Sequence, residues 1–145
     1  MRLKALQANE CKGDNVKMTE QQEQNNPCIL IVDDSRVIRN RVKRVLYNNE
    51  ISNIHLAENG LECLKLYREV KPDLVILDII LPDMDGIEIL EEIFNIDKTA
   101  KVIMLSAILS DKNVESAISM GAKACIPKPF DEKSFIQEVN KIISL

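Results

Sequence analysis

Residues 74–86, with the sequence LVILDIILPDMDG, restrict the fold more than any other stretch of this chain. Four apolar residues lead directly to Asp78, and an apolar pair, Pro82 and an acidic turn closed by Gly86 follow. An apolar run of this length is typical of a strand that is buried on both faces. Because proline and glycine favour turns, the sequence predicts that Asp78 stands at the carboxyl end of such a strand.

Similar apolar runs recur along the chain and alternate with patterns that are typical of amphipathic helices. We expect strands at 28–32, 54–57, 74–77, 101–105 and 124–127, of which the second is the weakest. A helical pattern follows each run. Suitable caps for three of the helices are Asp34 or Ser35, Ser110 or Asp111, and Asp131, and in another helix Leu61, Leu64 and Tyr67 or Val70 would face the core. This alternation predicts an α/β fold in which a five-stranded, mainly parallel sheet carries five helices on its two faces.

Length and composition indicate one aliphatic domain that follows a polar segment. The chain has 145 residues, of which 46% are hydrophobic and only 3% aromatic. We expect residues 1–26 to form a polar, flexible tail, because such a composition cannot bury apolar surface, and residues 27–145 to form the domain. A docking or targeting role for this tail stays open.

Charge, hydropathy and cysteine spacing exclude several classes of function. The formal net charge of −4 disfavours general binding to nucleic acid. No apolar run approaches the ~20 residues that a membrane span requires. The four cysteines are widely spaced without a CxxC pair, which disfavours a zinc site and is typical of reduced core thiols. We therefore expect a cytoplasmic protein that binds neither nucleic acid nor a membrane.

Acidic, hydroxyl and basic side chains stand at the ends of four expected strands. Asp33 and Asp34 follow the first strand, Asp78 the third, Ser106 the fourth and Lys128 the fifth. The carboxyl ends of parallel strands share one edge of the sheet, so these side chains should lie close together. Three carboxylates at close range repel one another, and a divalent cation with oxygen ligands, such as Mg²⁺, relieves that repulsion. A cation, a lysine and a hydroxyl donor around a nucleophilic carboxylate are the groups that phosphoryl transfer needs.

With these motifs the sequence resembles the receiver domain of a two-component response regulator. The resemblance covers about residues 27–145 and rests on four motifs: Val32-Asp33-Asp34-Ser35, Asp78 with residues 81–86, Ser106-Ala107, and Lys128-Pro129-Phe130. It implies a flavodoxin-like, doubly wound sheet with the strand order 2-1-3-4-5, which a chemotaxis member of the family also has. It also implies a cis peptide bond before Pro129.

The resemblance implies a role for each site residue. Asp78 would accept a phosphoryl group from a histidine kinase or a histidine phosphotransfer protein, and Lys128 and Ser106 would contact the phosphoryl oxygens. The Mg²⁺ site would comprise Asp33 (through water), Asp34, Asp78 and the backbone carbonyl of Ile80. The protein would then be a signalling receiver that assists its own phosphorylation and dephosphorylation, and not an enzyme acting on other substrates.

Three positions bear on how such a receiver would switch. The family typically has tyrosine or phenylalanine where Cys125 stands, and a cysteine cannot make the aromatic rotation that accompanies activation. The switch would therefore be damped, or it would act through Ser106 and the following loop alone. Ile80 and Ile108 occupy positions that tend to tune dephosphorylation in the family. Since neither can orient a water molecule, we predict slow self-dephosphorylation. Ile108 and its neighbour Leu109 are explained equally well by packing and by binding to a partner.

The output pathway has several readings. No DNA-binding or enzymatic segment follows the last helix, so we expect output through an unknown protein target, as in a chemotaxis regulator. The alternative is a relay intermediate that passes the phosphoryl group to a histidine carrier. The basic residues of the first helix slightly favour the relay, although solvation explains them more simply; they are Arg36, Arg39, Lys43 and Arg44. A metal-dependent phosphatase with an aspartyl nucleophile lacks its second acid at residue 80, and the complete acidic set argues against a phosphorylation-independent binding module.

Overall fold

The computed structural model describes residues 26–145, so the predicted tail lies almost wholly outside the described residues. Five strands alternate with five helices in this part of the chain. In chain order they are β1 (Cys28–Val32), α2 (Arg36–Asn48), β2 (Asn53–Ala57), α3 (Gly60–Val70), β3 (Leu74–Leu77), α4 (Gly86–Ile96), β4 (Val102–Ser106), α5 (Asp111–Met120), β5 (Ala124–Pro127) and α6 (Glu132–Ile143).

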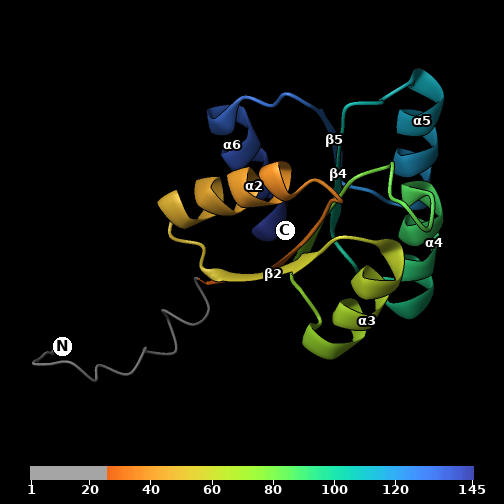
Figure 1. The fold of residues 1–145 in the computed structure, drawn as a ribbon, viewed down its shortest axis with the longest axis horizontal. Helices are drawn as coiled ribbons and strands as arrows, with labels where there is room; N and C mark the ends of the chain where they lie inside the picture. Colours follow the sequence, from red (N-terminus) through yellow and green to blue (C-terminus); the bar gives the residue numbers. More distant parts are fainter. Residues whose placement is uncertain (1–25) are drawn as a thin grey trace, which may run out of the picture.

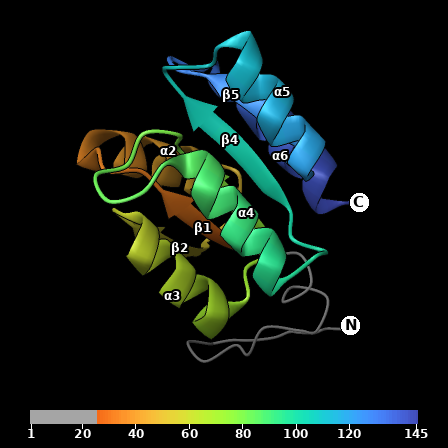
Figure 2. The same ribbon diagram turned by 90° about the vertical axis from the view of Figure 1, so that its right-hand side faces the viewer.

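The strands form one parallel sheet in the order β2-β1-β3-β4-β5. Figure 1 shows α2 and α6 on one side of the sheet and α3, α4 and α5 on the other. In Figure 2 the side that carries α3, α4 and α5 is turned towards the viewer. The doubly wound, flavodoxin-like architecture and its strand order are therefore confirmed.

Both faces of the sheet are buried, which explains why the strands are continuous apolar runs. In β1, Leu30 and Val32 pack in the layer beneath α3, α4 and α5, whereas Ile29 and Ile31 pack in the layer beneath α2 and α6. All four side chains are at most 1% exposed. Since each fully buried aliphatic side chain contributes about 1.5–3 kcal/mol, the central strands hold the two layers together.

Side-chain caps fix the point at which the helices begin. The side chains of Ser35, Asp85, Ser110 and Asp131 each accept a hydrogen bond from a backbone N–H in the first turn of the helix that follows. Such caps contribute about 1 kcal/mol each and place the helix start directly after the strand end. None of the helices in residues 26–145 has both the length and the apolar character needed to cross a membrane.

The core-facing side of α3 confirms the prediction for Leu64 and Tyr67 but not for Leu61. Leu61 is 70% exposed, and the buried residues of this helix are Gly60, Cys63, Leu64 and Tyr67. These four residues follow the helical spacing of one face, and Gly60 lies so close to α4 that an added Cβ would be 2.8 Å from a side-chain atom of Ile89. A small residue therefore takes a core position in α3, and the leucine beside it points to solvent.

Candidate functional site

The carboxyl edge of the sheet brings the predicted site residues together. Asp33, Asp78 and Lys128 directly follow β1, β3 and β5, and Ser106 is the last residue of β4. The Lys128 Nζ atom lies 2.5 Å from Asp33 Oδ2 and 2.9 Å from Asp78 Oδ2. One carboxylate oxygen each from Asp33, Asp34 and Asp78 lies within 4.8 Å of the others. Parallel strands thus place three carboxylates and an ammonium group in one cluster.

Backbone hydrogen bonds orient the two buried carboxylates. Asp33 is 3% exposed and Asp78 is 7% exposed. Asp33 Oδ1 accepts a hydrogen bond of 2.9 Å from the backbone N–H of Ser35, and Asp78 Oδ1 accepts one of 3.3 Å from that of Ile80. Asp34 is exposed, so the cluster is closed on the protein side and open to solvent at Asp34.

Burial and ion pairing act in opposite directions on the charges of the cluster. Burial raises the pKa of Asp33, against the hydrogen bonds from Lys128 and from the backbone of Ser35. Burial by itself would lower the pKa of Lys128, but the hydrogen bonds to Asp33 and Asp78 outweigh it and raise that pKa. Lys128 is therefore held in its charged form, and one ammonium group faces three carboxylates.

The donor set suits a hard divalent cation. Mg²⁺ prefers oxygen ligands and retains several waters, which the exposed side of the cluster at Asp34 can accommodate. One lysine compensates only part of the negative charge of three carboxylates, so a bound cation would reduce the remaining repulsion. Ile80 forms an isolated bridge with Asp85, and the role of its carbonyl as a ligand stays a prediction.

Ser106 lies at the same edge of the sheet, but its hydrogen bonds are to backbone groups and not to the carboxylate cluster. Its Oγ accepts a hydrogen bond of 3.3 Å from the backbone N–H of Ile108, and its carbonyl oxygen accepts one of 3.0 Å from the N–H of Lys128. Within residues 26–145 the Ser106 hydroxyl makes no hydrogen bond to Asp78. The hydroxyl instead holds the first residues of the loop that leads to α5.

The segment between β3 and α4 is fixed by contacts that the sequence did not reveal. The carboxylate of Asp83 accepts hydrogen bonds of 2.8 and 3.0 Å from the backbone N–H groups of Gly60 and Leu61. The Gly60 bond is the largest cause of a lowered pKa at Asp83. At the other end of the segment the Gly86 N–H donates to the Ile79 carbonyl at 2.6 Å. Asp83 thus ties the loop after Asp78 to the start of α3.

Arg39 is a further residue whose role the sequence did not indicate. Its guanidinium donates a hydrogen bond of 2.7 Å to the backbone carbonyl of Asp33, and its side chain is only 12% exposed. Arg39 is therefore part of the support of the carboxylate cluster, and its assignment to a solvated or docking face of α2 was wrong. Of the other basic residues on that face, Arg36 and Arg44 are exposed, whereas Lys43 is half-buried and lies over the Tyr47 ring.

The thiol of Cys125 occupies the position of the expected aromatic switch. Cys125 pairs with Met104 in the register of β4 and β5, is half-buried and packs against the layer beneath α3, α4 and α5. Burial raises the pKa of this thiol above its ordinary value. The side chain therefore acts as a small apolar group at the edge of the core. The Lys128-Pro129 peptide bond is cis, as expected.

Comparisons with known proteins agree with this geometry. The family model of the response regulator receiver domain matches residues 29–140. Chemotaxis protein CheY of Listeria monocytogenes is 44% identical over 113 residues, which are 78% of this chain and 95% of that protein. Chemotaxis protein CheY of Bacillus subtilis is 42% identical over 116 residues, which are 80% of this chain and 97% of that protein.

A solved structure supports the same relationship. CheY in the CheX-CheY-BeF3-Mg²⁺ complex of Borrelia burgdorferi is 34% identical, with a TM-score of 0.78 over 83% of this chain and 92% of that one. A CheY-like receiver domain of Methanospirillum hungatei is 28% identical, with a TM-score of 0.78 over 82% of this chain and 94% of that one.

Proposed function

Because the chain belongs to the response regulator receiver family, we propose that it is a stand-alone regulator that stores a phosphoryl group on Asp78. The described residues form a single receiver domain of the chemotaxis type. Residues 27–145 would be the receiver, and residues 1–26 would be an added segment. The protein would signal by binding another protein, in the cytoplasm, without nucleic acid or membrane.

One observation supports this proposal above all others. A single lysine, Lys128, contacts the carboxylates of both Asp33 and Asp78. A carboxylate oxygen of Asp34 lies within 4.8 Å of oxygens of these two acids, close enough for one cation to bind all three. A buried ion pair alone would need one carboxylate for one lysine. Two further acids at the same point favour a site that also binds a cation and an anion.

The chemistry proposed for Asp78 is a displacement at phosphorus. A carboxylate oxygen of Asp78 attacks the phosphorus of a phosphohistidine, and a P–O bond forms as the P–N bond breaks. The electron pair of the broken bond stays on the imidazole nitrogen, which leaves as neutral imidazole when the second ring nitrogen carries a proton. Lys128, which is 2.9 Å from Asp78 in the resting state, would then bind a phosphoryl oxygen.

The acidic residues beside Asp78 would hold Mg²⁺. Bound Mg²⁺ would neutralise charge that gathers on the phosphoryl oxygens. Asp34 and Asp78 would be direct ligands together with the carbonyl of Ile80, and Asp33 would act through water. Asp33 also stays paired with Lys128, so it positions the lysine between two carboxylates.

The readout would be a population shift in the loop after Ser106. The Ser106 hydroxyl would leave the N–H of Ile108, to which it is bonded at 3.3 Å, and donate to a phosphoryl oxygen. The loop to α5 would move with it. Because Cys125 is too small for an aromatic rotation, this loop would carry the switch without help from that position.

A histidine kinase or a histidine phosphotransfer protein is the proposed donor. Val37, Ile80 and Ile108 are apolar residues near the ends of β1, β3 and β4, and their exposed fractions are 75%, 52% and 50%. Exposed apolar residues around a polar site are typical of a protein-docking surface. A relay role is the alternative; since Arg39 is not available on α2, only Arg36 and Arg44 stand exposed to support it.

The proposal is tested by incubation with a small phosphodonor and Mg²⁺, followed by intact-mass measurement. We expect the wild-type protein to gain one phosphoryl group that hydroxylamine removes, as for an acyl phosphate. Asp78→Asn should gain none, because the amide is not a nucleophile. Asp111→Asn, a change at an exposed residue of α5, serves as the control and should react like the wild type.

Two results would overturn the proposal: a wild-type protein without a phosphoryl group, or an equal gain by Asp78→Asn. Phosphorylated protein mixed with candidate histidine phosphotransfer proteins then separates the two pathways. Transfer to the histidine would indicate a relay, and its absence a terminal regulator.

A further inference from the structure

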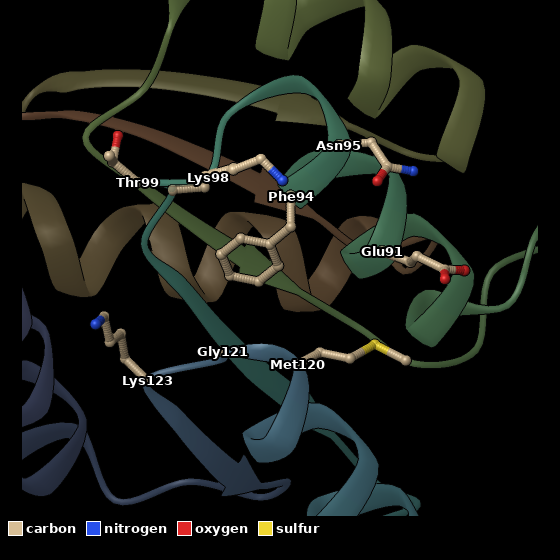
Figure 3. A pocket seen from close by; sticks show the side chains of 9 residues that line it. Glu91, Phe94, Asn95, Lys98, Thr99, Met120, Gly121 and Lys123 are labelled. Carbon is tan, nitrogen blue, oxygen red and sulfur yellow. The ribbon is translucent and has the colours of Figure 1, made fainter.

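An open pocket lies at the opposite end of the sheet from Asp78, between the last turns of α4 and α5. It has a volume of about 440 Å³ and is lined by Glu91, Phe94, Asn95, Lys98, Thr99, Ala100, Met120, Gly121 and Lys123. Figure 3 shows the Phe94 ring directed from α4 towards Gly121, with Lys98 and Met120 beside it. The receiver chemistry uses none of these residues.

The pocket combines an apolar floor with two exposed lysines, Lys98 and Lys123, and one exposed acid, Glu91. The floor is the half-buried ring of Phe94, together with Met120, which is 39% exposed. Gly121 has φ +119°, and a Cβ on it would lie 3.1 Å from Phe94 Cζ, so the backbone passes close beneath the ring. Lys98 and Lys123 are exposed, and within residues 26–145 neither forms an ion pair.

We propose that residues 14–20 of the same chain bind this pocket in an extended conformation. Alternate residues of this segment are Asp14, Val16, Met18 and Glu20, which would share one side of an extended chain. Two apolar side chains flanked by two acids complement an apolar floor flanked by two lysines. The Met18 thioether would pack on the Phe94 ring, a contact that sulfur and aromatic groups favour.

The point at which the domain begins makes this contact attainable. Asn26 leads into β1, while residues 98–101 precede β4 and residues 121–123 precede β5. Because the sheet is parallel, all these points lie at its amino edge. β1 and β4 are two strand spacings apart, roughly 10 Å, and a helix layer lies roughly 10 Å from the sheet. Eight peptide steps from Met18 to Asn26 span up to ~26 Å, which is enough.

The segment lies outside the part of the chain that the family match explains. The receiver match begins at residue 29, and the 113 residues shared with the Listeria monocytogenes relative cover 95% of that protein. The proposed occupant therefore lies outside the residues that the family model matches. None of the residues that line the pocket belongs to the carboxylate cluster around Asp78.

A photoreactive benzophenone amino acid in place of Met18, in the full-length protein, tests the contact. Irradiation at low protein concentration and peptide mapping should identify an intramolecular crosslink to residues 94–98 or 120–123. Placed at Thr19, on the other side of an extended segment, the same group should give several-fold less of this product. No phosphodonor is needed, so failure here is distinguishable from failure of phosphorylation at Asp78.

Charge reversal separates specific docking from chance contact. Lys98→Glu with Lys123→Glu changes only exposed side chains and should reduce the crosslink several-fold, while Asp14→Lys with Glu20→Lys in that background should restore it. The proposal is overturned if the product joins two copies of the chain, if it maps to another surface, or if charge reversal leaves its yield unchanged. A crosslink between copies would assign the pocket to self-association.

Discussion

At the scale of single residues, the most consequential contact joins side chains that are 50 positions apart in the sequence. Asp78 and Lys128 meet because β3 and β5 end at the same edge of one sheet. Their neighbours were identified from residue type and strand ends alone. Arg39 was not, because its bond to the Asp33 carbonyl depends on the direction in which α2 leaves the strand.

Ile80 provides a residue-scale test of the phosphoryl lifetime. It is 52% exposed and follows Asp78 by two positions, so it lies beside the proposed phosphoryl group. An apolar side chain there cannot orient water, and we expect the phosphorylated wild type to last minutes or longer. Ile80→Gln should speed the loss of the phosphoryl group several-fold, because an amide can hold a water near phosphorus.

The lifetime is measured by intact mass after removal of the phosphodonor. Ile118→Gln is the matched control, since Ile118 is 46% exposed on α5 and has no part in the site. A wild-type lifetime of only seconds, or equal rates for Ile80→Gln and wild type, would contradict the hypothesis.

At the scale of elements, the spacing of apolar residues predicts where the helices lie better than it predicts which face of each helix is buried. Residue patterns located every helix, but in α5 only Ala117 is buried, while Ile118 is exposed. The same occurred in α3, where Leu61 points outward and Cys63 inward. A short helix offers several stripes of similar hydrophobicity, and the neighbouring layer decides which of them is buried.

Gly86 tests the junction between the site and α4. A Cβ at this position would lie 2.5 Å from the Cα of Ile79 and still closer to the carbonyl of Asp78, both rigid backbone atoms. Alanine gains about 1 kcal/mol over glycine in a helix, but overpacking against rigid atoms costs about 1–3 kcal/mol or more. Because the clashing atoms belong to the backbone, the cost should lie at the upper end of that range, and Gly86→Ala should lower the free energy of unfolding by about 2 kcal/mol in urea denaturation.

The control for this change is Ser119→Ala on the exposed side of α5, which should leave stability nearly unchanged. Gly86→Ala should also slow phosphorylation at Asp78, because the same backbone carries the acceptor. A free energy of unfolding equal to or above that of the wild type would contradict the prediction, because it would show that the backbone near Ile79 moves to accept the added Cβ without loss of stability.

The contact between α3 and the end of α4 rests on Tyr67, which is 2% exposed and donates a hydrogen bond of 2.8 Å to Asp97 Oδ2. Tyr67→Phe should lower the free energy of unfolding by about 1 kcal/mol. Tyr47→Phe, at a tyrosine that is 48% exposed on α2, should have little effect. A loss of equal size in both variants would show that the Tyr67 bond contributes nothing specific.

The same pair predicts how stability depends on pH. Burial, and then the hydrogen bond to Asp97, raise the pKa of Tyr67 above its ordinary value. Its contribution to stability is therefore complete below about pH 10 and is lost as the pH rises through the higher folded-state value. Hydrogen bonds from Thr99, and then Tyr67, lower the pKa of Asp97, so its contribution is lost in acid. Above pH 10, wild type should lose stability more steeply than Tyr67→Phe.

At the scale of the whole molecule, a cation held by the folded chain should stabilise the fold. The three clustered carboxylates come from the ends of β1 and β3 and exist as a site only when the sheet is formed. Mg²⁺ at about 100 times its dissociation constant should then add about 2.7 kcal/mol to the free energy of unfolding. Asp34→Asn, which removes the exposed carboxylate proposed as a ligand, should lose most of this increment.

Thermal unfolding with Mg²⁺, with a chelator, and with NaCl at matched ionic strength measures the effect. The NaCl sample shows how much comes from general screening of the surface charge. A midpoint that rises equally in NaCl, or equally in Asp34→Asn, would exclude specific binding at this cluster.

The amino-acid sequence by itself determined the succession of strands and helices along the chain and the polar residues at the strand ends. Both follow from short-range patterns of residue type. Only the tertiary structure decided which partners those residues have. Lys128 lies between Asp33 and Asp78, Ser106 holds the loop to α5, and Asp83 accepts hydrogen bonds from the first two backbone N–H groups of α3. These contacts depend on the separations and directions of elements distant in sequence, which the packing of the two core layers fixes.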